Sequence, residues 1–113
     1  MANDPHQMVC EPCKGGVDPL AGDELLAYAS YVPEWDVVED RKITRTFKFR
    51  NFVDALAFVN RIGALAEEMG HHPDITLGWG KVGVTLFTHK IGGLHANDFI
   101  LAAHIDKLEG AST

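Results

Sequence analysis

Residues 42–70, which read KITRTFKFRNFVDALAFVNRIGALAEEMG, determine the architecture of this chain. Over residues 42–49 bulky side chains alternate with threonines and lysines, and this period of two is typical of a half-buried antiparallel strand. From Asn51 onward, apolar residues recur at helical spacing as far as Gly70. Asn51 is the expected N-cap, Asp54 favours the positive end of the helix, and Gly70 suits a left-handed C-cap. The stretch therefore predicts a strand followed directly by a long helix.

The flanking sequence predicts five further elements. They are a helix that Asp18-Pro19 opens and Val32-Pro33 ends, strands over 35–39, 74–79 and 81–89, and a helix over 95–108. Each strand pair is joined by a short turn and so forms an antiparallel hairpin, and the helices must cover one face of the sheet. The predicted fold is α+β, a four-stranded antiparallel sheet with three helices packed on one face, in the order helix-strand-strand-helix-strand-strand-helix.

The length of 113 residues predicts a single domain, because domains usually contain about 100–150 residues. Residues 1–17 hold two prolines, two glycines and both cysteines, so we expect a flexible N-terminal arm before a domain over 18–113. Three acids and no apolar segment in the first 20 residues argue against a signal peptide. No stretch approaches the roughly 20 apolar residues of a membrane span. With unpaired cysteines typical of a reducing cytosol, these features predict a cytoplasmic protein without a membrane partner.

The formal net charge is −6, from 10 Lys and Arg against 16 Asp and Glu. Nucleic-acid binding rests on clustered cations, so this balance is unfavourable for a nucleic-acid partner. Residues 41–61 are a local exception, with six cations and the single acid Asp54. A solvated strand and helix face explains this run, and an anion-contacting surface is the alternative.

Three of the six histidines stand at positions that suggest chemistry. His71 and His72 precede Pro73, which restricts His72 to an extended conformation and holds the pair stiffly. Consecutive residues of an extended chain point in opposite directions, so we expect the two to do different jobs. His89 is predicted at the end of the last strand, at the same edge of the sheet as this loop. The residue types leave open proton transfer near neutrality, metal binding and plain structural or surface histidines.

Further anchors surround the histidine pair at fixed spacing. They are Glu67, His71-His72-Pro73, Trp79, His89 and Asp98, together with Trp35 just before the first predicted strand. This pattern resembles the signature of the pterin-4a-carbinolamine dehydratases over residues 18–108. The resemblance implies the fold given above, assembled as a homodimer or homotetramer. It also implies a lyase that removes water from a 4a-hydroxytetrahydropterin to give quinonoid dihydropterin, with the pterin as substrate and no metal or organic cofactor.

The resemblance also implies roles for individual residues. It assigns catalytic acid and base roles to His71, His72 and His89, and substrate binding to Glu67, Trp35, Asp98 and Pro73. Hydroxide is a poor leaving group, so a protonated histidine should protonate the 4a-oxygen while a neutral histidine or water takes a ring proton. The reaction recycles the cofactor of aromatic amino-acid hydroxylases, which makes such a hydroxylase a candidate partner.

The residue types leave other roles open at four of these anchors. Glu67, one helical turn before His71, either bonds an imidazole or the pyrimidinone edge of the pterin, or is a solvated helix-end residue. Trp35 either packs against the pterin or belongs to the core. Trp79 alternates with apolar residues, which favours core or interface packing. Asp98 either orients a histidine or interacts with the N-terminus of the last helix.

Other features lie outside this pattern or depart from it. Cys10-Glu-Pro-Cys13 with His6 lacks a fourth ligand for a structural zinc site, so we expect inert cysteines unless an oligomer shares the site. Gly70 and His95 stand where better-known members of the family often carry a polar residue and a Ser or Thr cap. Relatives of this fold also serve as binding or assembly modules for partner proteins, and that is the alternative function.

Overall fold

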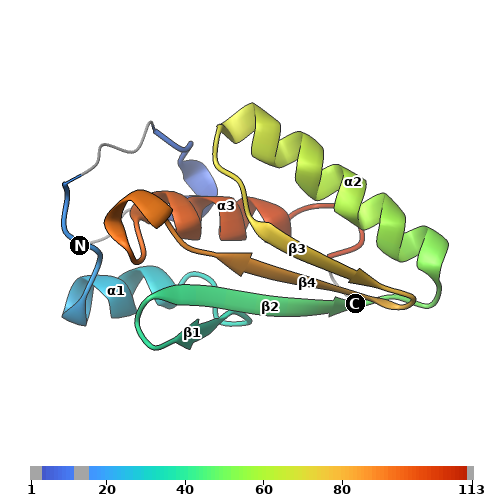
Figure 1. Cartoon of the computed structure of the whole chain (residues 1–113), viewed down its shortest axis with the longest axis horizontal. Coiled ribbons are helices and arrows are strands. Elements are labelled where there is room, and N and C mark those ends of the chain that lie inside the picture. Colours follow the sequence, from blue (N-terminus) through green and yellow to red (C-terminus); the bar gives the residue numbers. More distant parts are fainter. Residues whose placement is uncertain (1–3, 12–15, 112–113) are drawn as a thin grey trace.

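The structure is a computed structural model that describes residues 4–11 and 16–111. Its elements follow in the order η1 (Pro5–Gln7), α1 (Gly22–Ala29), β1 (Asp36–Val38), β2 (Lys42–Lys48), α2 (Phe52–Met69), β3 (Asp74–Gly78), β4 (Lys81–Leu86), η2 (His89–Ile91) and α3 (Ala96–Asp106). The elements η1 and η2 are single 3₁₀ turns. The predicted order of α-helices and strands is confirmed (Figure 1).

The four strands form one antiparallel sheet in the order β1-β2-β4-β3. The turn between β1 and β2 runs through Glu39 and Asp40, whose φ angles of 55° and 54° are those of a tight hairpin. The central strands β2 and β4 pair with Ile43 opposite Leu86. Because β3 and β4 form a hairpin, the start of β3 and the end of β4 lie at the same end of the sheet.

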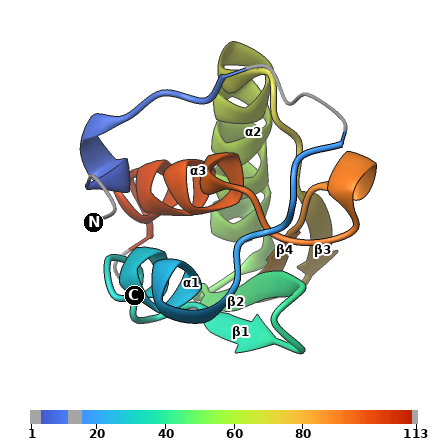
Figure 2. The same cartoon turned by 90° about the vertical axis from the view of Figure 1, so that its left-hand side faces the viewer.

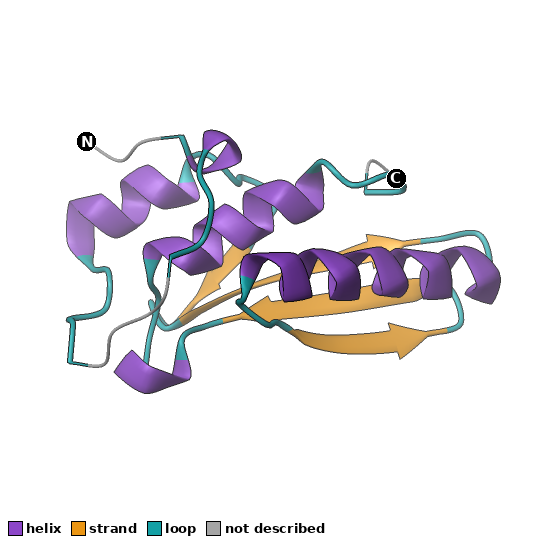
Figure 3. Cartoon of the chain, turned by 90° about the horizontal axis from the view of Figure 1, so that it is seen from above, coloured by secondary structure: helices purple, strands orange, loops and turns teal. Residues whose placement is uncertain are grey.

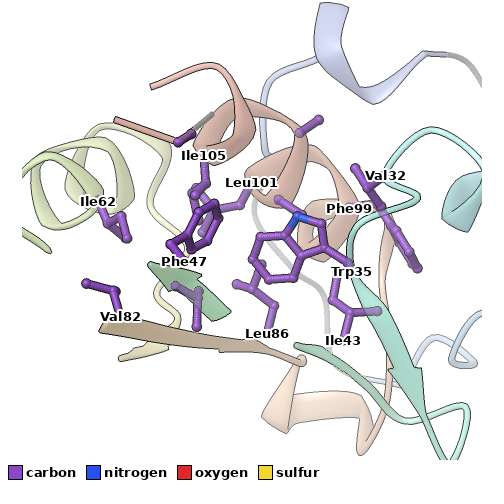
Figure 4. Packing of buried hydrophobic residues seen from close by; sticks show 14 of the residues in the cluster. Val32, Trp35, Ile43, Phe47, Ile62, Val82, Leu86, Phe99, Leu101 and Ile105 are labelled. Carbon is purple, nitrogen blue, oxygen red and sulfur yellow. The ribbon is translucent and has the colours of Figure 1, made fainter. Parts of the chain in front are cut away.

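The core lies between one face of the sheet and the helices (Figure 3, Figure 4). The sheet contributes Ile43 and Phe47 from β2 and Val82, Val84 and Leu86 from β4. They meet Phe58 and Ile62 from α2 and Phe99, Leu101 and Ile105 from α3. The helix α1 joins this core through Tyr28, whose ring stacks on that of Phe99 with centroids 5.5 Å apart. The prediction of an α+β fold with three helices on one face is confirmed.

The helix α2 begins and ends through the two caps that the sequence predicts. The Asn51 side chain accepts a hydrogen bond from the Asp54 N–H at 2.8 Å. Gly70 takes a left-handed conformation with φ 68°, and its N–H donates to the Ala66 carbonyl at 2.9 Å. A residue with a side chain would be strained at this φ, so Gly70 fixes where the following loop leaves the helix.

The helix α1 begins at Gly22, later than predicted from Asp18-Pro19. The residues before it are held by another part of the chain. Pro19 lies against Gly93, and the Leu20 N–H donates to the Leu94 carbonyl at 2.8 Å. The segment that was expected to start the helix therefore connects α1 to the loop before α3.

The strand β4 ends at Leu86, earlier than predicted. The Thr88 N–H donates to the Gly93 carbonyl at 2.8 Å, and the same two residues form an isolated bridge. The chain between them folds into the η2 turn, which begins at His89. The prediction that His89 ends the strand is therefore wrong, although the residue stays at the expected end of the sheet.

The η1 turn lies against α3 (Figure 2), and the backbone at Met8 and Glu11 is hydrogen-bonded to side chains of that helix. The flexibility of the arm stays a prediction, and Cys13 lies outside the described residues. Cys10 is a free, half-buried thiol. Among the helices of the described ranges, none is long and apolar enough to cross a bilayer.

Candidate active site

The loop that carries the two adjacent histidines is short and tightly bounded. It starts at Gly70, whose left-handed conformation ends α2, and it enters β3 directly after Pro73. The His71 N–H still donates to the Ala66 carbonyl at 3.3 Å. The four residues 70–73 therefore connect helix to strand, and the ends of two rigid elements position both imidazoles.

Asp98 is the buried centre of the site, with no exposed side-chain surface. Its Oδ1 lies 2.6 Å from Nε2 of His71. Its Oδ2 accepts hydrogen bonds from the Thr88 hydroxyl at 2.8 Å and from the His95 N–H at 3.0 Å. One carboxylate thus ties together the loop after α2, the residues after β4 and the first turn of α3. Asp98 fills both of the alternative roles considered for it, because it bonds a histidine and caps a helix.

His95 is the N-cap of α3 in place of the Ser or Thr often found there. Its Nδ1 accepts a hydrogen bond from the Asn97 N–H at 3.0 Å, while Asp98 reaches back to the His95 N–H. This reciprocal pair is a capping box. The His95 side chain therefore accepts a bond from the helix terminus, and the same capping box holds Asp98 against the His95 N–H.

His72 has a different partner from His71. Its Nε2 pairs with a carboxylate oxygen of Glu67 on the last turn of α2. The side chains of His72 and Glu67 are 61% and 78% exposed, whereas that of His71 is only 12% exposed. His71 therefore pairs with a buried acid, and His72 pairs with a solvent-exposed acid.

The three candidate histidines border one pocket of about 460 Å³. Its lining residues are Glu11, Gly70, His71, His72, Phe87, Thr88, His89, Lys90 and Asn97. The Phe87 and His89 rings are in contact, with centroids 4.1 Å apart. The pocket therefore combines imidazoles with an aromatic surface. No group of three or more His, Cys, Asp or Glu side chains in the described residues is arranged to hold a metal ion.

The two tryptophans lie away from this pocket. Trp35 is buried, its ring meets Phe47 edge-on, and its Nε1–H donates to Asp106 at 2.9 Å. This arrangement favours core packing over contact with a substrate. Trp79 is 69% exposed beside the β3–β4 turn, so the core alternative for Trp79 is wrong and the interface alternative stays a prediction.

Sequence reasoning missed a half-buried ion pair beside Trp35. The Arg45 guanidinium lies 2.7 Å from Asp106 and also packs over the Phe47 ring. Burial raises the pKa of the Asp106 carboxyl, against the lowering effect of the hydrogen bond from Trp35 and the charge of Arg45. Alternation in β2 puts Arg45 on the same face as the core residues Ile43 and Phe47. A cation on the core face indicates a buried acid paired with it, and this was the signal in the sequence.

A second pocket, of about 500 Å³, is lined in part by cations of the basic segment 41–61. Lys48, Arg50 and Arg61 line it. Arg50 pairs with Asp54 at 2.7 Å, and Arg61 with Glu109 at 3.9 Å. Because acids already neutralise two of the three cations, the structure favours the solvated-face interpretation of this run.

Comparison with known proteins identifies the family. A family model described as "Pterin 4 alpha carbinolamine dehydratase" matches residues 18–108. The chain belongs to this family. A relative from Rubrobacter xylanophilus named "Putative pterin-4-alpha-carbinolamine dehydratase" is 57% identical over 99 residues, covering 88% of this chain and 92% of that protein. A relative of the same name from Alkaliphilus metalliredigens is 54% identical over 99 residues, covering 87% and 89%.

Two solved structures of the pterin dehydratase type are also similar to this chain. One is described as a transcriptional coactivator/pterin dehydratase from Brucella melitensis, with TM-score 0.73, 31% identity, and coverage of 79% of this chain and 96% of that one. The other is described as a pterin dehydratase-like protein that is a RuBisCO assembly factor in the alpha-carboxysome, with TM-score 0.59, 28% identity, and coverage of 70% and 93%. One of these structures is therefore described as a transcriptional coactivator/pterin dehydratase and the other as an assembly factor.

Proposed function

We propose that this chain is a 4a-hydroxytetrahydropterin dehydratase, a lyase that releases water and quinonoid dihydropterin. The observation that carries the proposal is the single pocket bordered by His71, His72 and His89. Membership of the family and the names of the relatives support the same activity. The Phe87 ring offers a flat apolar surface for the bicyclic pterin.

His71 is the proposed base. A carboxylate only accepts hydrogen bonds, so Nε2 of His71 carries the proton shared with Asp98, and Nδ1 is left to take another. Asp98 is itself held by Thr88 and His95, so the ring is oriented before substrate arrives. The proton that Nδ1 takes comes from a ring N–H of the pterin, whose electron pair then forms the new double bond.

One of the two exposed imidazoles, His72 or His89, is the proposed acid. It gives a proton to the 4a-oxygen as the C4a–O bond breaks, so the leaving group departs as water. One proton is given and one is taken, and the step uses no metal ion or organic cofactor. Glu67 and Asp98 are then positioning residues for His72 and His71, Pro73 stiffens the loop between them, and Trp35 has a role in packing.

The test is an assay on chemically generated 4a-hydroxytetrahydropterin, with quinonoid formation followed by ultraviolet absorbance. No acceleration above buffer by the folded protein would reject the proposal. Replacement of a principal proton carrier by Ala should lower the rate by about 10²–10⁴-fold. His6→Ala is the matched control, because His6 bonds Asp4 and does not line the pocket. Wild-type turnover by His71→Ala/His72→Ala would reject the histidine mechanism even if the activity is real.

The second candidate function is a binding or assembly module for a partner protein. The similarity to a RuBisCO assembly factor of the alpha-carboxysome supports it, whereas the three histidines in one pocket favour the enzyme. Recovery of a stoichiometric partner in a pull-down, together with a silent pterin assay, would favour the module. The homodimer or homotetramer, the cytoplasmic location and a hydroxylase partner stay predictions, and light scattering of the purified chain tests the first.

A further inference from the structure

The N-terminal segment is fixed to α3 by side chains of that helix. The His104 Nε2 lies 2.6 Å from the Met8 carbonyl. The Lys107 ammonium donates to the His6 carbonyl at 2.8 Å. These contacts bring the chain along α3 toward the N-terminal turn of that helix, where Asp98 lies. Residues 4–11 therefore approach the candidate active site although they precede the matched residues 18–108.

Asn97 holds the last described residue of this segment, Glu11, with two reciprocal hydrogen bonds. The Glu11 N–H donates to Asn97 Oδ1 at 3.0 Å, and Asn97 Nδ2 donates to the Glu11 carbonyl at 2.5 Å. Asn97 is only 2% exposed, so its amide depends on these partners. The Cys10 thiol donates to the Asn97 carbonyl at 3.6 Å. The backbone at Glu11 is thus fixed beside Asp98.

The consequence is that Glu11 lines the same pocket as the three histidines. Among the described residues that line this pocket, Glu11 supplies the carboxylate and Lys90 the cation, while Asp98 lies buried behind them. Glu67, the acid first expected to meet the substrate, is instead paired with His72 and is absent from the described lining. The Glu11 side chain is exposed and its backbone is anchored.

We propose that Glu11 binds the substrate, with Asn97 as the positioning residue that fixes it. The inference rests on the proposed function. The amino-pyrimidinone edge of a pterin presents a ring N–H and an adjacent amino group, and the two oxygens of a carboxylate can accept one hydrogen bond from each. Glu11, which precedes the family match over residues 18–108, would therefore bind the substrate in a pocket where the histidines transfer protons. Glu11 acts on binding and the histidines act on the chemical step.

The test compares Glu11→Gln and Glu11→Ala with Glu34→Gln, a control at an exposed acid that does not line the pocket. Loss of a charge-assisted pair of hydrogen bonds at a partly solvated site should raise KM about 10-fold and leave kcat within about twofold. The Kd of 7,8-dihydrobiopterin, a probe with the same pyrimidinone edge that is not dehydrated, should rise by the same factor in calorimetry. Unchanged KM and Kd in both Glu11 variants would overturn the inference.

The role of Asn97 has a readout that needs no pterin. In the full chain, Asn97→Ala should increase the hydrogen-exchange rate of the Glu11 amide and raise KM without lowering kcat. Asn97→Asp keeps the acceptor oxygen and should restore protection of that amide, while it loses the bond to the Glu11 carbonyl. Full protection of the Glu11 amide in Asn97→Ala would overturn the positioning role. A wild-type chain that neither turns over substrate nor binds the probe would instead reject the proposed function.

Discussion

Replacing Asp98 by Asn should move the proton of the His71 ring from Nε2 to Nδ1 and keep the other hydrogen bonds of the site. In the wild-type chain Oδ1 faces the His71 ring, and Oδ2 accepts from Thr88 and His95. An Asn with its oxygen at the Oδ2 position keeps the last two bonds, and its amino group then faces His71. The facing ring nitrogen must become an acceptor, so its proton moves to Nδ1, the nitrogen proposed to take the pterin proton.

The expected loss in kcat is about 10²–10⁴-fold, or about 2.7–5.4 kcal/mol of barrier. The free energy of unfolding should fall by about 1–3 kcal/mol, because hydrogen bonds to a charged carboxylate become weaker bonds to a neutral amide. Thermal unfolding by circular dichroism, the pterin assay and the ¹⁵N shifts of the His71 ring measure the three quantities. A folded Asp98→Asn variant with wild-type kcat would refute the role of the tautomer.

The control is Asp106→Asn, which alters a carboxylate that also bonds two side chains. This carboxylate lies in the Trp35 and Arg45 cluster and does not line the histidine pocket. The substitution should lower stability and leave kcat unchanged. An equal loss of kcat in both variants would mean that Asp98 acts through general stability and has no specific effect on His71.

Three further predictions concern titration, thiol chemistry and metals. Burial raises the pKa of the Asp106 carboxyl, so this carboxyl binds a proton more tightly in the folded chain than in the unfolded chain. The free energy of unfolding therefore falls as the pH rises from 3.8 until the carboxyl ionises in the folded state. Urea unfolding should show wild type losing stability relative to Asp106→Asn over that window, and a relative gain would contradict the sign. Burial, with the Asp98 charge, raises the pKa of the Cys10 thiol from 9.0 to about 11. In the Cys13→Ser variant, Cys10 should therefore react with iodoacetamide at pH 8 about 100-fold more slowly in the folded chain than in urea. Equal rates would count against burial of this thiol. Dialysis against EDTA should leave kcat within about twofold, because the proposed step is proton transfer between imidazoles and substrate; a loss that Zn²⁺ restores would point to metal chemistry.

The sequence predicted those parts of the fold that depend on neighbouring residues. Asn51 and Gly70 set the ends of α2 through local hydrogen bonds and a left-handed conformation. The different partners of His71 and His72 agree with the different roles that the sequence predicts for consecutive residues of an extended chain. Their meeting with His89 follows from the hairpin of β3 and β4, since a hairpin brings its outer ends together. Local geometry therefore accounts for the histidine pocket.

Contacts between distant parts of the chain could not be predicted in this way. The Glu11 and Asn97 pair spans 86 residues, and the Arg45 and Asp106 pair spans 61. Each depends on how α3 is rotated over the sheet, which no periodicity within a single segment specifies. For the same reason, alternation in β3 could not show that Trp79, in the turn after this strand, is exposed. An aromatic at an apolar register position is buried only where a second layer meets it.

The contrast between His71 and His72 has a consequence for turnover. Each proposed cycle leaves the base with an extra proton and the acid without one, so both must be reset before the next substrate. His72 and its partner Glu67 are mostly exposed, and an exposed imidazole exchanges protons directly with bulk water. His71 is nearly buried against Asp98 and lines the pocket, so in the proposed cycle its proton exchanges with water through the pocket that the product occupies. In the proposed cycle, reset of the base is therefore coupled to product release.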